Sequence, residues 1–83
     1  MLEFMYDTQL LIDGKGLNED EIAQYIAQNI EGDSLIAVGG DTLIKIHYHT
    51  NTPWKVLEYC AGLGDIYDVV VENMERQEQG LQG

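Results

Sequence analysis

Residues 34–50 decide the fold, and they read "SLIAVGGDTLIKIHYHT", two apolar runs separated by a pair of glycines. Glycine tolerates positive φ, so Gly39 and Gly40 predict a tight turn between two antiparallel strands. In the second strand apolar and polar residues alternate from Ile44 onward, which places Ile44, Ile46 and Tyr48 on one face of a sheet. We therefore expect a β-hairpin, with further elements on either side of it.

Each flank of the hairpin contains one strand and one helix. Upstream, residues 4–12 ("FMYDTQLLI") read as a strand, and Asn18 with Glu21 three positions later predicts a helix that ends within residues 29–32. Downstream, Thr52 followed by Pro53 predicts a second helix, and residues 65–73 ("DIYDVVVEN") read as the last strand. The helical apolar stripes are Ile22, Tyr25, Ile26 and Ile30 in the first helix and Val56, Leu57, Cys60 and Leu63 in the second.

The resulting order, β-α-β-β-α-β, predicts an α+β fold of the ferredoxin-like type. Because helix crossovers are right-handed, the four strands form an antiparallel sheet in the order 4-1-3-2 with both helices on one face. We expect residues 1–77 to form this single domain and residues 78–83 to be a flexible polar tail. Low order is expected from residue 74 onward.

Composition limits the partners and the compartment. Fifteen acidic residues against four basic ones give a net charge of −11, so nucleic acid and anionic membranes are poor partners. Cys60 is the single cysteine, which excludes an internal disulfide framework, and it falls on an apolar stripe as a core residue would. No apolar run approaches a membrane span of roughly 20 residues, and a cytoplasmic location is expected.

His47 and His49 alternate with the apolar residues of the third strand, so they lie on the sheet face that points away from the helices. The first and third strands are the antiparallel central pair, which brings Asp7 to the same end of the same face. Two imidazoles and a carboxylate are a Zn²⁺-type ligand set with an open fourth position. The alternative is that the two histidines are solvated or belong to an interface.

Three ordered stretches resemble the middle domain of the fatty acid kinase family, also called DAK phosphatase-like proteins. They are "GDSL" (residues 32–35), "KIHYHTNTP" (residues 45–53) with the following "VLEY", and "ENMERQ" (residues 72–77). The resemblance extends from Tyr6 to Gln77. Such proteins look like three-part chains, with an ATP-binding DhaL-like kinase domain, this middle domain and a C-terminal domain similar to DegV-type fatty acid carriers.

The resemblance implies partners, cofactors and metal ligands. This chain would be an excised middle segment that joins the flanking kinase and carrier-like domains, meets a DegV-type fatty-acid-binding protein and forms a homodimer. ATP and Mg²⁺ would belong to the kinase domain. In the family, the two histidines and a first-strand cysteine look like metal ligands, and they correspond here to His47, His49 and Asp7. Asp7 departs from the family pattern Tyr-Cys-Thr-Glu-Phe and is a harder ligand than a thiolate, although Zn²⁺ remains the expected ion.

Three functional hypotheses follow. The chain has no glycine-rich phosphate loop with a lysine and no Mg²⁺-binding carboxylate cluster, so we do not expect it to be a complete enzyme by itself. The leading hypothesis is a linking and dimerising middle domain with a metal site at Asp7, His47 and His49. The alternatives are a metal-assisted site for an acyl phosphate or phosphate oxygen, and a metal-free ferredoxin-like regulatory or ligand-binding module.

Overall fold

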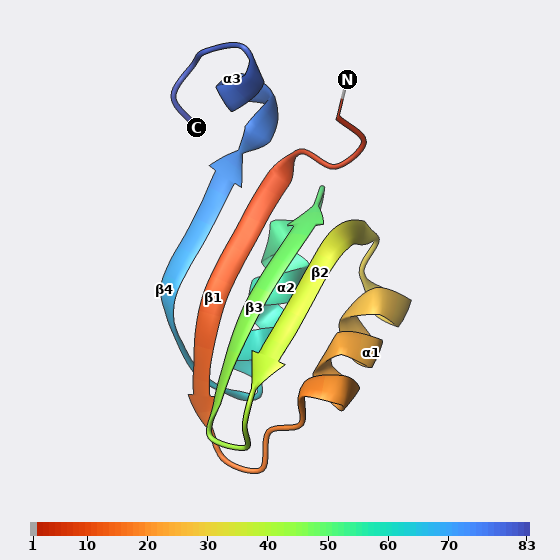
Figure 1. Ribbon diagram of the computed structural model, residues 1–83, viewed down its shortest axis with the longest axis vertical. Coiled ribbons are helices and arrows are strands. Elements are labelled where there is room, and N and C mark those ends of the chain that lie inside the picture. Colours follow the sequence, from red (N-terminus) through yellow and green to blue (C-terminus); the bar gives the residue numbers. More distant parts are fainter. Residues whose placement is uncertain (1) are drawn as a thin grey trace.

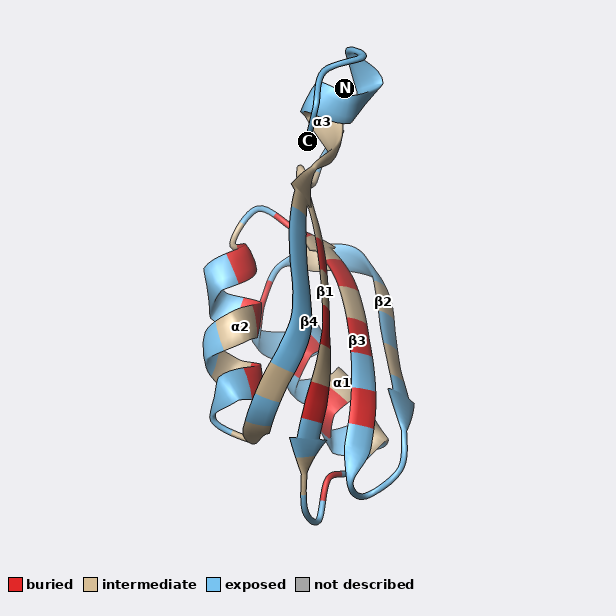
Figure 2. Ribbon diagram, turned by 90° about the vertical axis from the view of Figure 1, so that its left-hand side faces the viewer, coloured by how far each residue is buried: buried red, intermediate tan, exposed pale blue. Residues whose placement is uncertain are grey.

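The computed structural model describes residues 2–83, which form one four-stranded antiparallel sheet with the strand order β2-β3-β1-β4. Its elements are β1 (Tyr6–Gly14), α1 (Glu19–Asn29), β2 (Gly32–Gly39), β3 (Leu43–Thr50), α2 (Pro53–Ala61), β4 (Gly64–Asn73) and α3 (Met74–Glu78). Helices α1 and α2 cover the same face of the sheet, α1 against β2 and α2 against β1 and β4 (Figures 1 and 2). The predicted ferredoxin-like topology is confirmed.

The turn between β2 and β3 requires glycine at position 39. Gly39 has φ +147°, and a Cβ atom there would collide with the carbonyl oxygen of Leu43. The N–H of Gly39 donates to Oε2 of Glu19 at 2.9 Å, and the N–H of Gly40 donates to the carbonyl oxygen of Leu43, also at 2.9 Å. The hairpin is therefore fixed both internally and to the first turn of α1.

Both helices start where the sequence predicts. Asn18 caps α1, since its side-chain oxygen accepts a hydrogen bond from the N–H of Glu21 at 3.0 Å. Thr52 precedes α2 but makes no capping hydrogen bond with its side chain, and Pro53 occupies the first turn. The start of α2 thus depends on the fixed φ of Pro53 rather than on a side-chain cap.

The hydrophobic core lies between the sheet and the two helices. Its members are Leu10, Ile12, Leu17, Ile22, Ile26, Ile30, Ile44, Ile46, Tyr48, Val56 and Cys60. β3 alternates between buried and less buried residues as predicted (Figure 2). One member of the predicted α1 stripe differs, because Tyr25 is 43% exposed and stacks on Tyr59 with ring centroids 3.9 Å apart. That pair lies at the rim of the helix layer.

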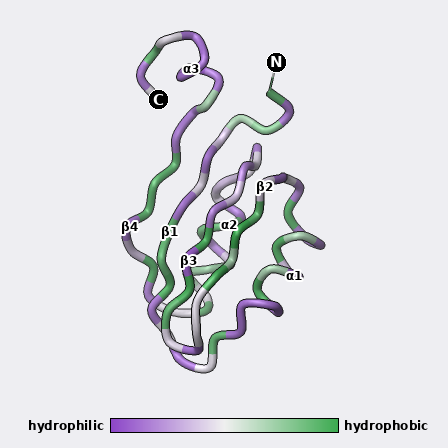
Figure 3. Tube along the Cα trace, viewed as in Figure 1, coloured by the Kyte–Doolittle hydropathy of each residue, from purple (hydrophilic) through white to green (hydrophobic). Residues whose placement is uncertain are grey.

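Residues 74–78 form the short helix α3, although low order was expected from residue 74 onward. Asn73 caps this helix by accepting a hydrogen bond from the N–H of Arg76 at 3.0 Å, and the N–H of Met74 donates to the carbonyl oxygen of Met5 at 2.8 Å. The helix projects beyond the end of the sheet and is mostly hydrophilic (Figures 1 and 3). The domain end at residue 77 and the flexibility of residues 78–83 stay predictions.

Within residues 2–83, no helix is long and apolar enough to cross a bilayer.

Tyr48 provides a test of the core. Its hydroxyl donates to the carbonyl oxygen of Ile30 at 2.6 Å, and burial, followed by the charges of Asp33 and Glu31, raises the pKa of Tyr48. Tyr48→Phe should lower the free energy of unfolding by about 1–2 kcal/mol, because it removes a buried hydrogen bond between β3 and the end of α1. Urea denaturation followed by circular dichroism measures this change.

Tyr67→Phe is the matched control, since it removes a hydroxyl from a tyrosine that is 40% exposed. We expect little change in its unfolding midpoint. Equal losses for the two variants would contradict a specific role for the Tyr48 hydrogen bond.

Candidate metal centre

A row of polar residues crosses the sheet face that α1 and α2 leave open. In the strand register Asp33 of β2 lies opposite His49 of β3, His49 lies opposite Asp7 of β1, and Asp7 lies opposite Glu72 of β4. Directly opposed residues project on the same face of a sheet. His47, two positions before His49 on β3, lies on that face as well, opposite Gln9. The predicted placement of Asp7, His47 and His49 on the open face is confirmed.

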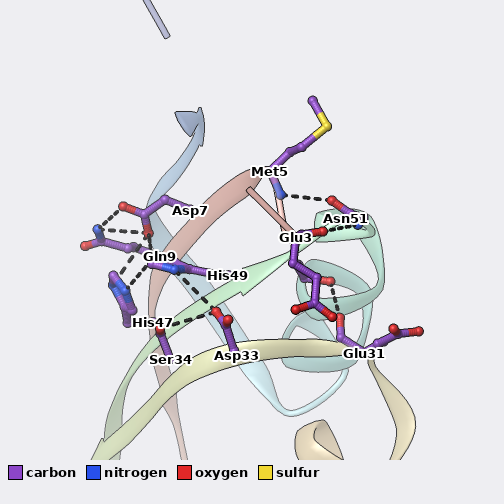
Figure 4. A network of polar contacts seen from close by, with 11 residues as sticks. Glu3, Met5, Asp7, Gln9, Glu31, Asp33, Ser34, His47, His49 and Asn51 are labelled. Atoms are coloured by element: carbon purple, nitrogen blue, oxygen red, sulfur yellow. Dashed lines mark hydrogen bonds and ion pairs between the residues drawn. The ribbon is translucent and has the colours of Figure 1, made fainter. Parts of the chain in front are cut away.

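The side chains of these three residues converge (Figure 4). Nε2 of His47 lies 3.1 Å from Nε2 of His49, and Oδ1 of Asp7 lies 3.5 Å from Nδ1 of His47 and 4.0 Å from Nε2 of His49. One donor atom from each residue lies within 4.8 Å of the others. In a tetrahedral zinc site with bonds of about 2.0–2.2 Å, neighbouring ligand atoms are about 3.3–3.6 Å apart. The three residues therefore fit a divalent ion after small side-chain rotations.

The site is half-buried and electronegative. The side chains of His47, His49 and Asp7 are 22%, 25% and 19% exposed, so an ion or a small oxyanion can reach them from solvent. Glu72 and Asp33 add carboxylates on either side of the row, which favours a cation. Three protein ligands leave one tetrahedral position open for water or another oxygen ligand.

Two supporting residues were not recognised from the sequence. Nε2 of Gln9 donates to both carboxylate oxygens of Asp7, at 3.3 and 3.1 Å, and restrains that side chain. Oδ1 of Asp33 lies 3.6 Å from Nδ1 of His49. Strand alternation places Gln9 beside Asp7 on the open face, and its amide could have been considered as a donor. Asp33 gives no comparable signal, because its position depends on an irregularity in β2.

The rest of the open face is largely apolar. Its exposed hydrophobic side chains, which we call the open-face strip, are Ile36, Val38, Leu43, Tyr67 and Val70. A hollow of about 290 Å³ lies beside the strip, lined by Gln9, Leu10, Leu11, Lys45, Asp68 and Val70. No helix among residues 2–83 covers this surface (Figure 2).

Comparison with known proteins identifies the family. Residues 3–81 match the model of the FakA-like middle domain, a family of fatty acid kinase middle domains. The chain belongs to this family. Curated relatives of this middle domain include uncharacterized proteins of Staphylococcus aureus strains USA300, NCTC 8325 and COL. Each is 32% identical over 78 residues, which are 89% of this chain and 14% of the relative. The chain thus spans about one seventh of the length of these relatives.

The cysteine of this FakA-like middle domain is not part of the site. Cys60 is fully buried in α2, on the opposite side of the sheet from His47 and His49. Burial raises the pKa of the Cys60 thiol to about 12. Cys60 therefore cannot replace the first-strand cysteine of the family pattern, and its prediction as a core residue is confirmed.

This placement predicts an unreactive thiol. At about pH 8 the folded domain should not react with a chromogenic disulfide reagent within minutes, because the thiol is neutral and inaccessible. After denaturation in guanidinium chloride, one thiol per chain should react. Rapid stoichiometric labelling of the folded domain would contradict the buried position of Cys60.

Proposed function

We propose that this domain links an ATP-binding kinase domain to a carrier-like domain in a FakA-like fatty acid kinase protein, and that it holds a divalent metal ion. The ligands are Asp7, His47 and His49, and Zn²⁺ is the preferred ion. One observation carries the proposal: donor atoms from two central strands, about forty positions apart in sequence, lie within 4.8 Å of one another. Membership of the family supports the linking role.

The ligand chemistry supports zinc without restricting the site to it. Two imidazole nitrogens suit Zn²⁺, whereas the Asp7 carboxylate is a harder donor than a thiolate and also accepts Mn²⁺. Because the ligands come from β1 and β3, an ion would bridge the two central strands and stabilise the folded state through binding.

Within the whole protein this domain would support catalysis rather than perform it. ATP and Mg²⁺ are assigned to the kinase domain, and the fatty acid to the carrier-like domain or to a DegV-type partner. A cytoplasmic location is part of the same proposal.

A second candidate function uses the open ligand position directly. The partial exposure of His47 and His49 would let an acyl phosphate or phosphate oxygen reach the ion, which would polarise that oxygen. A full-length protein carrying His47→Ala discriminates the two functions. Loss of phosphoryl transfer with intact assembly favours direct handling, whereas loss of assembly with an intact isolated kinase domain favours the linking role.

A third candidate is a metal-free regulatory or ligand-binding module. The hollow beside the open-face strip favours it, because its volume of about 290 Å³ is near the lower limit for small-molecule sites. Metal content of the purified domain separates this function from the other two.

Zinc titration by calorimetry tests the metal site. The unaltered domain should bind one Zn²⁺ per chain, and His47→Ala or His49→Ala should weaken binding by at least about 100-fold, since each removes an imidazole ligand. Asp7→Cys should tighten zinc binding by supplying a softer donor. Affinity should fall as the solution is acidified from about pH 8 to about pH 5.5, because protons compete for the imidazoles.

Lys45→Ala is the control for these variants, because Lys45 shares the face and the strand of the histidines without offering a ligand at neutral pH. It should bind zinc at least as tightly as the unaltered domain. If the unaltered domain shows neither heat nor a thermal shift with Zn²⁺, Mn²⁺ or Ni²⁺, the metal proposal is wrong.

Dimerisation through the open-face strip is a separate prediction. The net charge of −11 opposes association at low salt, so the weight-average mass in sedimentation should rise between about 0.02 M and about 0.5 M salt. Val38→Glu should abolish the rise by burying a charge in the contact. Gln24→Glu, which adds the same charge on exposed α1, should not. A monomer at every salt and protein concentration would remove this interface.

A further inference from the structure

His49 has a different neighbour at each ring nitrogen. Nε2 faces the metal-ligand cluster, 3.1 Å from Nε2 of His47 and 4.0 Å from Oδ1 of Asp7. Nδ1 faces the other way, 3.6 Å from Oδ1 of Asp33 on β2 (Figure 4). An imidazole that binds a metal through one nitrogen keeps the other for a hydrogen bond, and that bond decides which nitrogen carries the proton.

A backbone irregularity places Asp33 beside His49. The register between β2 and β3 shifts between Asp33 and Ile36, so two residues of β2 oppose one residue of β3. Ser34, in this bulge, has φ +58°, a left-handed conformation that is unfavourable for a residue other than glycine. Counted back from the Gly39 turn without the shift, Ser34 rather than Asp33 would lie opposite His49.

The neighbouring residues fit the same geometry. A Cβ atom at Gly32 would collide with the carbonyl oxygen of His49 and would approach the ring of Tyr48 to 2.6 Å, so β2 lies close against β3 here. The hydroxyl of Ser34 donates to Oδ1 of Asp33 at 3.3 Å. Backbone strain concentrated beside a candidate site is consistent with a positioning role, because strain of this kind persists where the surroundings enforce it.

We propose that Asp33 is a positioning residue for the metal centre. Its carboxylate accepts a hydrogen bond from Nδ1–H of His49 and thereby keeps Nε2 unprotonated and directed toward the ion. This inference rests on the metal-binding function proposed above. Asp33 is not itself a ligand, because it lies at the far edge of the His49 ring, outside the cluster of three donor atoms.

The role is specific to one histidine. Nδ1 of His47 faces Asp7 and its Nε2 faces His49, so both ring nitrogens of His47 point to ligand residues. His49 alone of the two has a carboxylate outside the cluster. It is therefore the oriented ligand, while the ring of His47 selects its binding nitrogen only when the ion arrives.

The experiment compares Asp33→Ala and Asp33→Asn with Asp41→Ala as the matched control. Asp41 lies in the hairpin turn at the opposite end of the sheet, so its removal changes net charge equally. Two quantities are measured on the same 83-residue domain. They are the zinc dissociation constant, by competition with a chromogenic chelator, and the tautomer of His49 in metal-free protein, by long-range ¹⁵N–¹H NMR.

In the unaltered domain His49 should carry its proton mainly on Nδ1 at about pH 8. Asp33→Ala should remove this preference and weaken zinc binding by about 10- to 100-fold, the usual effect of losing such a partner. Asp33→Asn retains an acceptor oxygen and should fall between the two. Asp41→Ala should alter neither quantity.

Support requires both changes at Asp33. If zinc affinity falls equally in Asp41→Ala, or falls without a change of tautomer, the effect is general electrostatics and the positioning role is wrong. Unchanged affinity in Asp33→Ala overturns the role while leaving the metal function in place. Absence of zinc binding by the unaltered domain overturns both. Should Asp33→Ala unfold, Asp33→Asn supplies the same comparison.

Discussion

The antiparallel pairing of β1 with β3 is the constraint on which the rest of the structure depends. The two strands remain in one register from Tyr6 opposite Thr50 to Asp13 opposite Leu43, without a bulge. A slip by one residue would move Ile44 and Ile46 from the core to solvent and would separate Asp7 from His49. The same pairing thus fixes the hydrophobic core on one face and the candidate metal centre on the other.

The regular part of this arrangement could be predicted from the sequence because a strand has a period of two. Alternation alone assigned His47 and His49 to the open face, and Pro53 and Asn18 marked the helix starts. The irregular part could not. The left-handed Ser34 follows from the close approach of Gly32 to Tyr48, a contact between strands that no local pattern encodes. A register counted from the hairpin turn therefore misses Asp33.

Both edge strands are irregular, whereas the central pair is regular. Ser34 in β2 and Asp68 in β4 have φ of +58° and +50°, and each lies where the register against the inner strand shifts. Bulges of this kind disrupt a row of free backbone groups and discourage the addition of another strand. Each also has a local consequence on the open face. One brings Asp33 to His49, and the other places Asp68 at the hollow beside Val70.

The open face must remain stable whether or not an ion is bound, and amide side chains make this feasible. Asp7 and Glu72 are direct cross-strand neighbours, and like charges in that position repel. Gln9 donates to Asp7, and Gln77 of α3 donates to Glu72 at 2.9 Å, so each carboxylate has a neutral donor of its own. The core lies on the opposite face and includes none of these groups. An ion would therefore add to a fold that is already complete, and α3, through Gln77, connects the C-terminal segment to the same polar row.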